Sequence, residues 1–226
     1  MELTKEMLAK TFDETLLDPL ATKKDIEELC ERAKKYNFAS VAILPCNVAH
    51  ASACLKGSNV KVCAAVGFPL GSIPPEAKAS EAADAVENGA DEVDMVMNIG
   101  ALKAGCLDLV KRDIEAVVAA SKGKTVKVII EISLLTEVEA KMACILAGEA
   151  GADYVKSSTG FKGFPIRPTS ANDVQYMRRH AAADVKVKAA GGIRTPEDAL
   201  AVIKAGADRI GTSSGAKILE AYEGSV

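Results

Sequence analysis

The chain has 226 residues, of which 49% are apolar and 26% charged, so its composition is that of a globular protein of one or two domains and not of a disordered or fibrous one. No apolar run approaches the roughly 18 residues that a membrane span needs, and the first residues lack the apolar core of a secretory signal. A net charge of −3 argues against nucleic acid as the main partner.

Cysteine and histidine usage narrows the chemistry. The six cysteines lie scattered, without a Cys-x-x-Cys pair, and are expected to be reduced thiols of a cytoplasmic protein. The two histidines, His50 and His180, are assigned ordinary structural positions. They are too few for a histidine-rich metal site or a Ser-His-Asp triad. Acid–base chemistry therefore falls to Asp, Glu, Lys or water, and no metal or other cofactor is expected.

Short β-branched runs alternate with longer stretches rich in Ala, Glu, Lys and Leu. Strands are predicted at 12–17, 39–44, 61–66, 92–97, 125–132, 154–158, 185–190 and 209–213. Helices are predicted near 22–36, 47–55, 74–89, 106–121, 136–150, 169–181, 196–205 and 214–223. Several helix starts carry the expected signals, such as Thr22 as an N-cap and the pair Thr195-Pro196.

Eight strand–helix units with short loops and no linker predict one compact (β/α)8 barrel with a short N-terminal helix. The barrel is expected to form a single domain over residues 1–226. A doubly wound open sheet is the alternative, but it offers no reason for eight units.

An internal repeat supports the barrel. The segments NGADEVDMV (88–96), AGADYVKSS (150–158) and AGADRIGTS (205–213) each place a glycine just past a helix and then enter a strand, by our count the fourth, sixth and eighth. Aligned in this way, Asp94, Lys156 and Gly211 occupy one position. Because inward side chains from alternate strands of a barrel form a layer, Asp94 and Lys156 should share a layer, with open space at Gly211.

Charges inside strands are the main functional signal, because removing an unpaired ion from water costs several kcal/mol. Besides Asp94 and Lys156, the seventh strand, VKVKAA, places Lys186 and Lys188 on the face opposite its valines. Lys188 lies nearer the carboxyl end, where barrel active sites are found, and Lys186 lies near the closed end, where it can extend out to solvent.

Two lysines and an aspartate suggest covalent chemistry. A lysine amine is nucleophilic only when neutral, and its ordinary pKa is about 10.4. A second ammonium about 5 Å away contributes about 3 kcal/mol of repulsion at an effective dielectric of 20, and burial acts in the same direction. Such a lysine can form a Schiff base, which permits cleavage of the adjacent carbon–carbon bond, while Asp94 and a water move protons. Metal-free aldol chemistry is the hypothesis.

Glycine-rich segments follow the last two strands. Ala190-Gly-Gly-Ile-Arg-Thr195 and Gly211-Thr-Ser-Ser-Gly215 stand where barrels often bind phosphate with backbone amides. Arg194 either adds charge there or supports the loop.

These motifs resemble those of the deoxyribose-phosphate aldolases, a class I aldolase family. The resemblance runs from about residue 12 to about residue 220. The matching segments are VGFPLG (66–71), EVDMVMNIGALKAG (92–105), KVIIEISLL (127–135), GADYVKSSTGF (151–161), KAAGGIRTPEDAL (188–200) and RIGTSSG (209–215).

The resemblance implies reversible cleavage of 2-deoxy-D-ribose 5-phosphate to D-glyceraldehyde 3-phosphate and acetaldehyde. It implies that Lys156 forms the Schiff base, that Lys188 lowers its pKa and that Asp94 is the partner acid and base. It further implies a homodimer with a phosphorylated sugar as substrate. The residues implied around the phosphate are Thr159, Gly160, Gly191, Gly192, Ser213 and Ser214.

The sequence also departs from the family. Glu14 and Asp18 stand where basic residues are usual, and the exchange is expected to alter packing at the strand end or a subunit contact. The segment 162–169 replaces a Gly-Gly-Ala-Thr loop. In it, Lys162 or Arg167 replaces backbone contacts to phosphate, or the loop admits a different substrate.

Three other interpretations stay open. One is a Schiff-base aldolase or lyase acting on another sugar phosphate or carbonyl substrate. Another is a phosphate-binding barrel isomerase without covalent chemistry. The last is a binding or scaffold protein, which buried, mutually repelling lysines make unfavourable.

Overall fold

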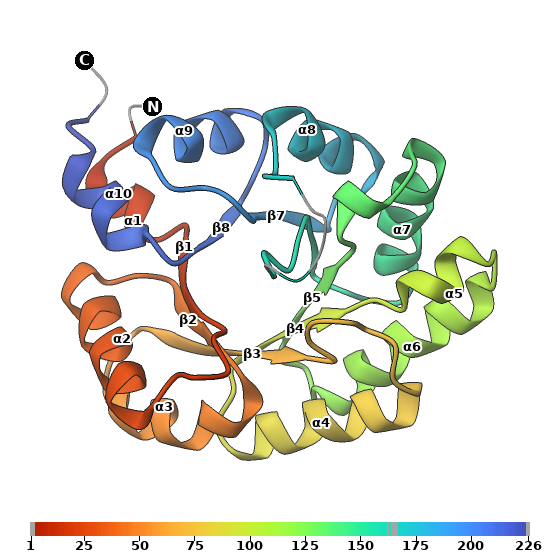
Figure 1. Cartoon of the computed structure of the whole chain (residues 1–226), viewed down its shortest axis with the longest axis horizontal. Helices are drawn as coiled ribbons and strands as arrows, with labels where there is room; N and C mark the ends of the chain where they lie inside the picture. The colour runs from red at the N-terminus through yellow and green to blue at the C-terminus, as the bar shows by residue number, and fades with distance from the viewer. Residues whose placement is uncertain (1–2, 162, 164–166, 225–226) are drawn as a thin grey trace.

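A closed parallel barrel forms the centre of the molecule (Figure 1). The computed structural model describes residues 3–161, 163 and 167–224. Neighbouring strands pair in chain order, and β1 pairs with both β2 and β8, which excludes an open sheet and confirms the predicted (β/α)8 barrel. The strands are β1 (Phe12–Leu16), β2 (Ser40–Ile43), β3 (Lys61–Val66), β4 (Glu92–Val96), β5 (Thr125–Ile129), β6 (Tyr154–Lys156), β7 (Lys186–Ala190) and β8 (Arg209–Thr212).

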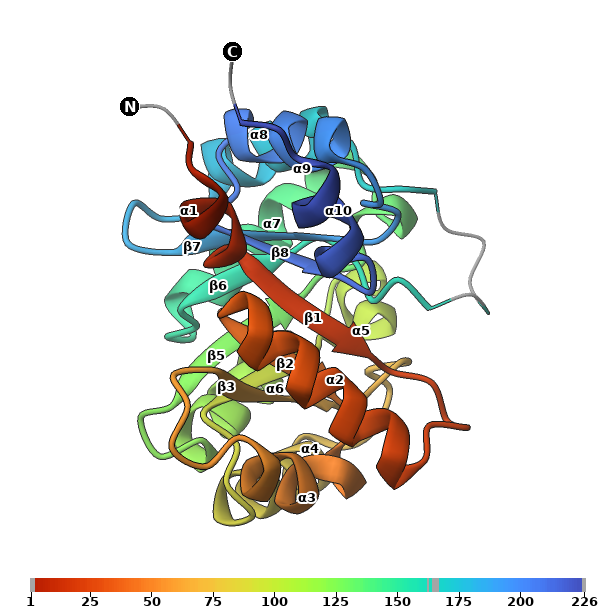
Figure 2. The same ribbon diagram turned by 90° about the vertical axis from the view of Figure 1, so that its left-hand side faces the viewer.

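Helices surround the barrel on its outside. They are α1 (Lys5–Ala9), α2 (Lys23–Tyr36), α3 (Val48–Cys54), α4 (Pro75–Glu87), α5 (Ile99–Lys103), α6 (Leu107–Ala120), α7 (Glu137–Glu149), α8 (Ala171–His180), α9 (Pro196–Lys204) and α10 (Gly215–Ala221), with 3-10 turns η1 (Pro45–Asn47) and η2 (Ile132–Leu134). The predicted N-terminal helix is α1, which packs beside α10 at one side of β1 (Figure 2). Within the described residues, none of the helices combines the length and apolar character needed to cross a bilayer.

Local chemistry explains where the helices begin. Thr22, Thr136, Ser170 and Thr195 each accept a hydrogen bond from the backbone of the first helical turn and receive an acidic side chain in return, which forms a capping box. Helix α5 was not predicted, although the Asn98 side chain caps it by accepting from the backbone N–H of Ala101.

Two strands end clearly earlier than predicted, at turns that build the upper face of the barrel, whereas β3 and β7 end at the predicted residues. β5 ends at Ile129 instead of 132, because Glu131 adopts a left-handed backbone conformation and η2 follows. β6 ends at Lys156 instead of 158, since the next residues enter the loop beside β7.

The repeated Gly-Ala-Asp turns join each helix to its strand and also tie neighbouring strands together. Gly89, Gly151 and Gly206 all have positive φ, as the pattern predicts. The aspartate of each turn accepts a hydrogen bond from a backbone N–H at the start of the neighbouring strand, at 2.8–3.1 Å. The bonds run from Val62 to Asp91, from Val126 to Asp153 and from Val187 to Asp208. The aspartate of the motif thus sets strand register at the closed end of the barrel.

Apolar residues fill the space between strands and helices. Val93, Met95, Val155 and Val187 are fully buried in this layer, so alternate residues of the same strands point into the barrel. The barrel interior therefore receives the charged residues of β4, β6 and β7.

Lys78 is a fully buried lysine outside the barrel interior. Its ammonium donates to the carbonyl oxygens of Gly71 and Val96 and to Asp113 Oδ2, at 3.0, 2.7 and 2.6 Å. Burial lowers the pKa of Lys78 and raises that of Asp113, and their mutual attraction offsets only part of this cost. Lys78 thereby fastens the loop after β3 to the end of β4.

Replacing Lys78 with methionine is expected to lower the free energy of unfolding by about 3–5 kcal/mol, because Asp113 is left buried without its cation. Urea unfolding measures the change. The matched control is Lys24→Met, whose exposed ion pair with Glu28 should contribute less than about 1 kcal/mol. Similar small effects for both variants would contradict the bracing role.

Candidate active site

Asp94 is the meeting point of the buried charges. Its Oδ2 accepts hydrogen bonds from Lys156 Nζ and Lys188 Nζ, each at 2.7 Å. Its Oδ1 accepts from Lys127 Nζ at 2.8 Å and from the Cys63 thiol at 3.0 Å. The two amines named by the sequence analysis therefore lie side by side on one carboxylate oxygen, in the same layer of the barrel.

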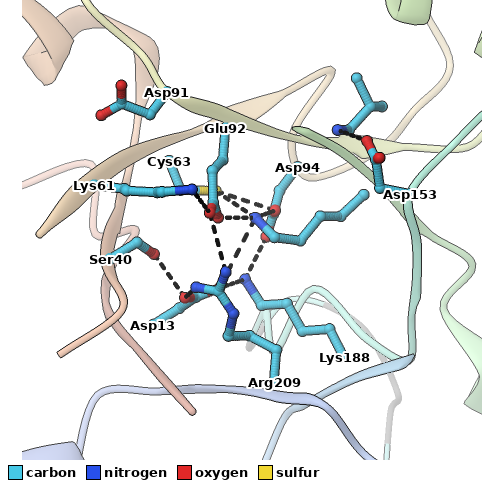
Figure 3. A network of polar contacts seen from close by, with 12 residues as sticks. Asp13, Ser40, Lys61, Cys63, Asp91, Glu92, Asp94, Asp153, Lys188 and Arg209 are labelled. Atoms are coloured by element: carbon cyan, nitrogen blue, oxygen red, sulfur yellow. Dashed lines mark hydrogen bonds and ion pairs between the residues drawn. The ribbon is translucent and has the colours of Figure 1, made fainter. Parts of the chain in front are cut away.

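A second group of charges lies next to this centre, and Figure 3 shows its contacts with Asp94 and Lys188. Glu92 precedes Asp94 by two residues on β4, so this second layer lies towards the closed end. Asp13 contacts Lys188 at 2.5 Å and Arg209 at 2.6 Å. Glu92 contacts Arg209 at 3.0 Å and Lys127 at 2.6 Å. The two layers form one continuous network, so the position of Lys188 is fixed from both sides.

The balance of charges in this network indicates which of the amines loses its proton most readily. Within the described part of the chain, three carboxylates face four cationic groups inside the barrel, which leaves one positive charge in excess when every group is ionised. Lys61 also contacts Glu92, at 3.6 Å, but it is half exposed and lies outside the barrel interior. Among the described residues, Lys188 contacts two carboxylates and Lys127 three, whereas Lys156 contacts only Asp94. Lys156 is thus the group whose loss of a proton makes the interior neutral.

The pKa shifts follow the same pattern. Burial lowers the pKa of Lys156, Asp94 opposes this, and the charge of Lys188 lowers it further. Burial would also lower the pKa of Lys188, but Asp13 and Asp94 outweigh it and raise that pKa. Burial acts on Asp94 too, yet the three ammonium groups of Lys127, Lys156 and Lys188 hold its pKa well below the usual range. Burial is therefore a larger cause of Lys156 activation than the like-charge repulsion emphasised by the sequence analysis.

A cavity of about 490 Å³ opens above this network at the carboxyl ends of the strands. Lys156 reaches it and is 3% exposed, while Asp94 and Lys188 lie below it. Gly211 also borders the cavity, and a Cβ there would lie 3.1 Å from Lys188 Cε, so this glycine leaves the predicted space beside the amines. Five residues of the expected phosphate set line the same cavity: Thr159, Gly160, Gly191, Gly192 and Ser213.

The loop after Lys156 uses its hydroxyl groups to hold itself in place. The Ser157 hydroxyl donates to the Ala190 carbonyl and accepts from the Ala190 N–H, which joins the ends of β6 and β7. The Ser158 hydroxyl accepts from the Gly160 N–H. Thr159 donates both its backbone N–H and its hydroxyl to Glu131, so neither donor is directed at the cavity.

Two described residues, Gly192 and Arg167, show how the end of the 162–169 segment, which differs from the family, is held near the site. A Cβ on Gly192 would lie 2.6 Å from Pro168, so the glycine lets the two segments approach. Arg167 binds both carboxylate oxygens of Asp173 at 2.6 and 2.7 Å and so secures the start of α8, and it is not among the described residues that line the cavity. Lys162, the other residue suggested for phosphate, lies outside the described residues.

Glu14 and Asp18, the two acidic residues at positions where the family usually has basic ones, lie in different environments. Glu14 is buried, accepts from the Gly215 N–H at 3.0 Å and lies 3.5 Å from Arg32. Burial raises the pKa of Glu14. Asp18 is exposed at the rim of the cavity, and its carboxylate accepts from the Leu20 N–H. Ser214, between these loops, is not among the described residues that line the cavity, and its own N–H donates to Thr212.

Sequence reasoning missed four members of the network: Asp13, Glu92, Lys127 and Arg209. A signal for Lys127 was available, since it alternates with Val126 and Val128 in the way that Lys188 alternates with Val187.

Lys186 reaches solvent as expected, with its amine 5.7 Å from the centre of the Tyr154 ring. His50 contacts Glu27, and His180 contacts the carbonyl of Tyr176 at the end of α8, as structural residues would.

Comparisons with known proteins agree on one family. Residues 7–221 match the family described as DeoC/LacD family aldolase. A deoxyribose-phosphate aldolase of Streptococcus gordonii is 55% identical over 213 residues, which span 94% of this chain and 96% of that protein.

Two solved structures have the same fold. A putative deoxyribose-phosphate aldolase from Coccidioides immitis aligns with a TM-score of 0.92 and 41% identity, covering 97% of this chain and 87% of the other. A deoxyribose phosphate aldolase from Aeropyrum pernix, described as a unique tetramer, aligns with a TM-score of 0.89 and 36% identity, covering 96% and 91%.

Proposed function

The chain belongs to the DeoC/LacD aldolase family, and from this premise we propose that it is a lyase that cleaves 2-deoxy-D-ribose 5-phosphate reversibly to D-glyceraldehyde 3-phosphate and acetaldehyde. One observation carries the proposal. Lys156 is the cavity-facing amine of a network that becomes neutral when this amine loses its proton. Schiff-base formation requires a neutral amine, and burial and a neighbouring ammonium both favour that form.

The geometry supports the following reaction. Lys156 Nζ attacks the C1 aldehyde of the open-chain sugar to form a carbinolamine, which loses water to give a protonated imine. The imine accepts the electron pair of the C2–C3 bond as that bond breaks and the C3 hydroxyl loses its proton. D-glyceraldehyde 3-phosphate leaves, the two-carbon enamine is protonated at C2, and water releases acetaldehyde from Lys156.

Asp94 and Lys188 are proposed as the proton-handling groups of this sequence. Asp94 is held ionised, and Lys188 is held protonated 2.7 Å from it. With a water molecule as relay, this pair can take up the proton of the C3 hydroxyl and return a proton to the enamine.

The phosphate is proposed to lie at the glycine turns of the cavity wall. Gly160, Gly191 and Gly192 all have positive φ, which turns backbone groups in directions that other residues rarely adopt. We include Ser213 and Ser214 from the β8–α10 turn in this subsite, and Thr159 as part of its wall.

Reduction with borohydride in the presence of acetaldehyde tests the proposal. Mass mapping should find a two-carbon adduct on Lys156, and a parallel assay should show turnover of 2-deoxy-D-ribose 5-phosphate. An adduct without turnover would indicate another carbonyl substrate. The absence of any adduct would favour an isomerase or a binding protein.

Replacing Asp94 with asparagine is expected to lower kcat by about 10²–10³-fold, because asparagine cannot accept the transferred proton. KM should change less than about threefold, since Asp94 lies below the cavity and does not reach the phosphate. Steady-state kinetics measure both constants. A raised KM with normal kcat would reverse the assignment.

Assembly and location remain proposals of the same kind. We propose that residues 1–226 act as one catalytic domain and form a homodimer, and light scattering would distinguish a dimer from a tetramer such as that described for the Aeropyrum pernix relative. All six cysteines are unpaired, which suits the reducing cytoplasm as the place of action.

A further inference from the structure

Glu131 is a buried residue to which the reaction above assigns no task. It belongs to the segment KVIIEISLL, directly after β5, and its side chain is fully buried. Its backbone has φ 47° and ψ 60°, a left-handed conformation that residues other than glycine rarely adopt. Strained backbone of this kind concentrates at functional sites.

The strain comes from a bulge beside the strand of Lys156. The Ile130 N–H donates to the Lys156 carbonyl, and the Ile132 N–H donates to the Ser157 carbonyl. Two residues on the β5 side thus advance for one residue on the β6 side, and Glu131 is the extra residue. Bulges next to active sites redirect a side chain, and this one directs a carboxylate into the protein.

The redirected carboxylate binds one residue in two ways. Its Oε2 accepts the backbone N–H of Thr159 at 2.9 Å and the hydroxyl of Thr159 at 2.5 Å. Its Oε1 is buried without a hydrogen-bond partner among the described residues. A buried carboxylate is unfavourable when one oxygen lacks a hydrogen-bond partner among the described residues, and the backbone conformation of Glu131 is unfavourable too. Its contacts to Thr159 therefore call for a functional explanation.

Thr159 begins a turn that forms one wall of the substrate cavity. Its hydroxyl oxygen accepts the Phe161 N–H at 3.1 Å, and Gly160 follows with φ 67°. A Cβ on Gly160 would lie 3.7 Å from Gly191 Cα, so this turn packs against the glycine turn after β7. Glu131 therefore anchors one of the two turns between which the phosphate is proposed to bind.

We propose that Glu131 is a positioning residue that holds the Thr159–Phe161 turn in place and thereby sets the affinity for the phosphate end of the substrate. The inference rests on the proposed function and deepens it. Glu131 acts through Thr159 and does not touch the substrate, so its removal should change KM far more than the reactivity of Lys156.

Glu131→Gly is the decisive variant, because glycine accepts the left-handed backbone while the side chain and its carboxylate are removed. KM for 2-deoxy-D-ribose 5-phosphate should rise about tenfold or more, as expected when hydrogen bonds to a charged group are lost. Borohydride trapping of acetaldehyde on Lys156 involves no phosphate and should change less than about twofold. Glu131→Gln keeps an acceptor for Thr159 and should recover KM to within about threefold of the original value.

Lys122→Gly is the matched control, since Lys122 also has a left-handed backbone, φ 51°, but is exposed and remote from the cavity. Its KM should be unchanged. A folded Glu131→Gly protein with unchanged KM would overturn the inference, and so would parallel losses in KM and trapping, which indicate a general structural role.

Thr159→Val keeps the inference testable if the Glu131 variants do not fold. It removes the hydroxyl donor and should raise KM in the same direction, and an unchanged KM would overturn the inference. The proposed function fails by a separate result: the unaltered protein would trap no acetaldehyde on Lys156.

Discussion

Lys156→Leu is expected to abolish cleavage of 2-deoxy-D-ribose 5-phosphate, lowering kcat/KM by about 10⁴-fold or more, because Lys156 is the one lysine among the described residues that lines the cavity. The protein should remain folded. Leucine removes the one positive charge in excess of the carboxylates, so three cationic groups then face three carboxylates inside the barrel. The measurements are steady-state turnover, adduct mapping and thermal unfolding.

Three outcomes would contradict this role. Turnover that persists in Lys156→Leu would exclude Lys156 as the nucleophile. An adduct that moves to Lys188 with normal turnover would mean that the two amines exchange tasks. Loss of turnover together with loss of folding would point to a structural role instead, and the unfolding curve detects it.

Lys188→Leu should shift the acid limb of the pH profile of kcat/KM by about one pH unit or more to the alkaline side. Lys188 repels the Lys156 ammonium and competes for Asp94, so its removal raises the pKa of Lys156. The charge balance agrees, since without Lys188 the interior is neutral when Lys156 is protonated. The neutral amine is the reactive form, so activity at neutral pH should fall about tenfold for each unit of the shift.

Lys186→Leu is the matched control, because Lys186 lies two residues away on β7 but reaches solvent at the closed end. Its profile should not move. If Lys188→Leu lowers the maximum of kcat/KM but leaves the midpoint of the acid limb unchanged, Lys188 acts in proton transfer alone. That result would contradict its electrostatic role.

Much of the fold followed from periodicity and turn chemistry. The eight strands and the main helices were located because β-branched runs, capping residues and the Gly-Ala-Asp turns are local signals. The strand ends were placed too late where the turn is not local. Glu131 gives no sign in the sequence of its left-handed backbone, which depends on pairing with the carbonyl groups of Lys156 and Ser157.

The site was predictable where charge interrupted an apolar strand, as at Asp94, Lys156 and Lys188. Asp13 and Arg209 were missed because each has a charged neighbour, Glu14 and Asp208, so neither stands out as a charge within an apolar run. Their contact across the closure between β1 and β8 is a product of tertiary structure. The sequence also could not show that burial lowers the pKa of Lys156 more than the charge of Lys188 does, because burial depends on the packing of the whole barrel.

The closure of the barrel has a consequence for when reactivity appears. Lys156, Asp94, Lys188 and Asp13 come from β6, β4, β7 and β1, and β1 meets β8 only at the last pairing. In a chain whose ring has not closed, Lys156 is expected to be a solvated amine with an ordinary pKa of about 10.4, so only a small fraction of it is in the neutral, nucleophilic form at neutral pH. Closure of the ring buries Lys156 and thereby lowers its pKa, so the amine becomes reactive only in the folded barrel.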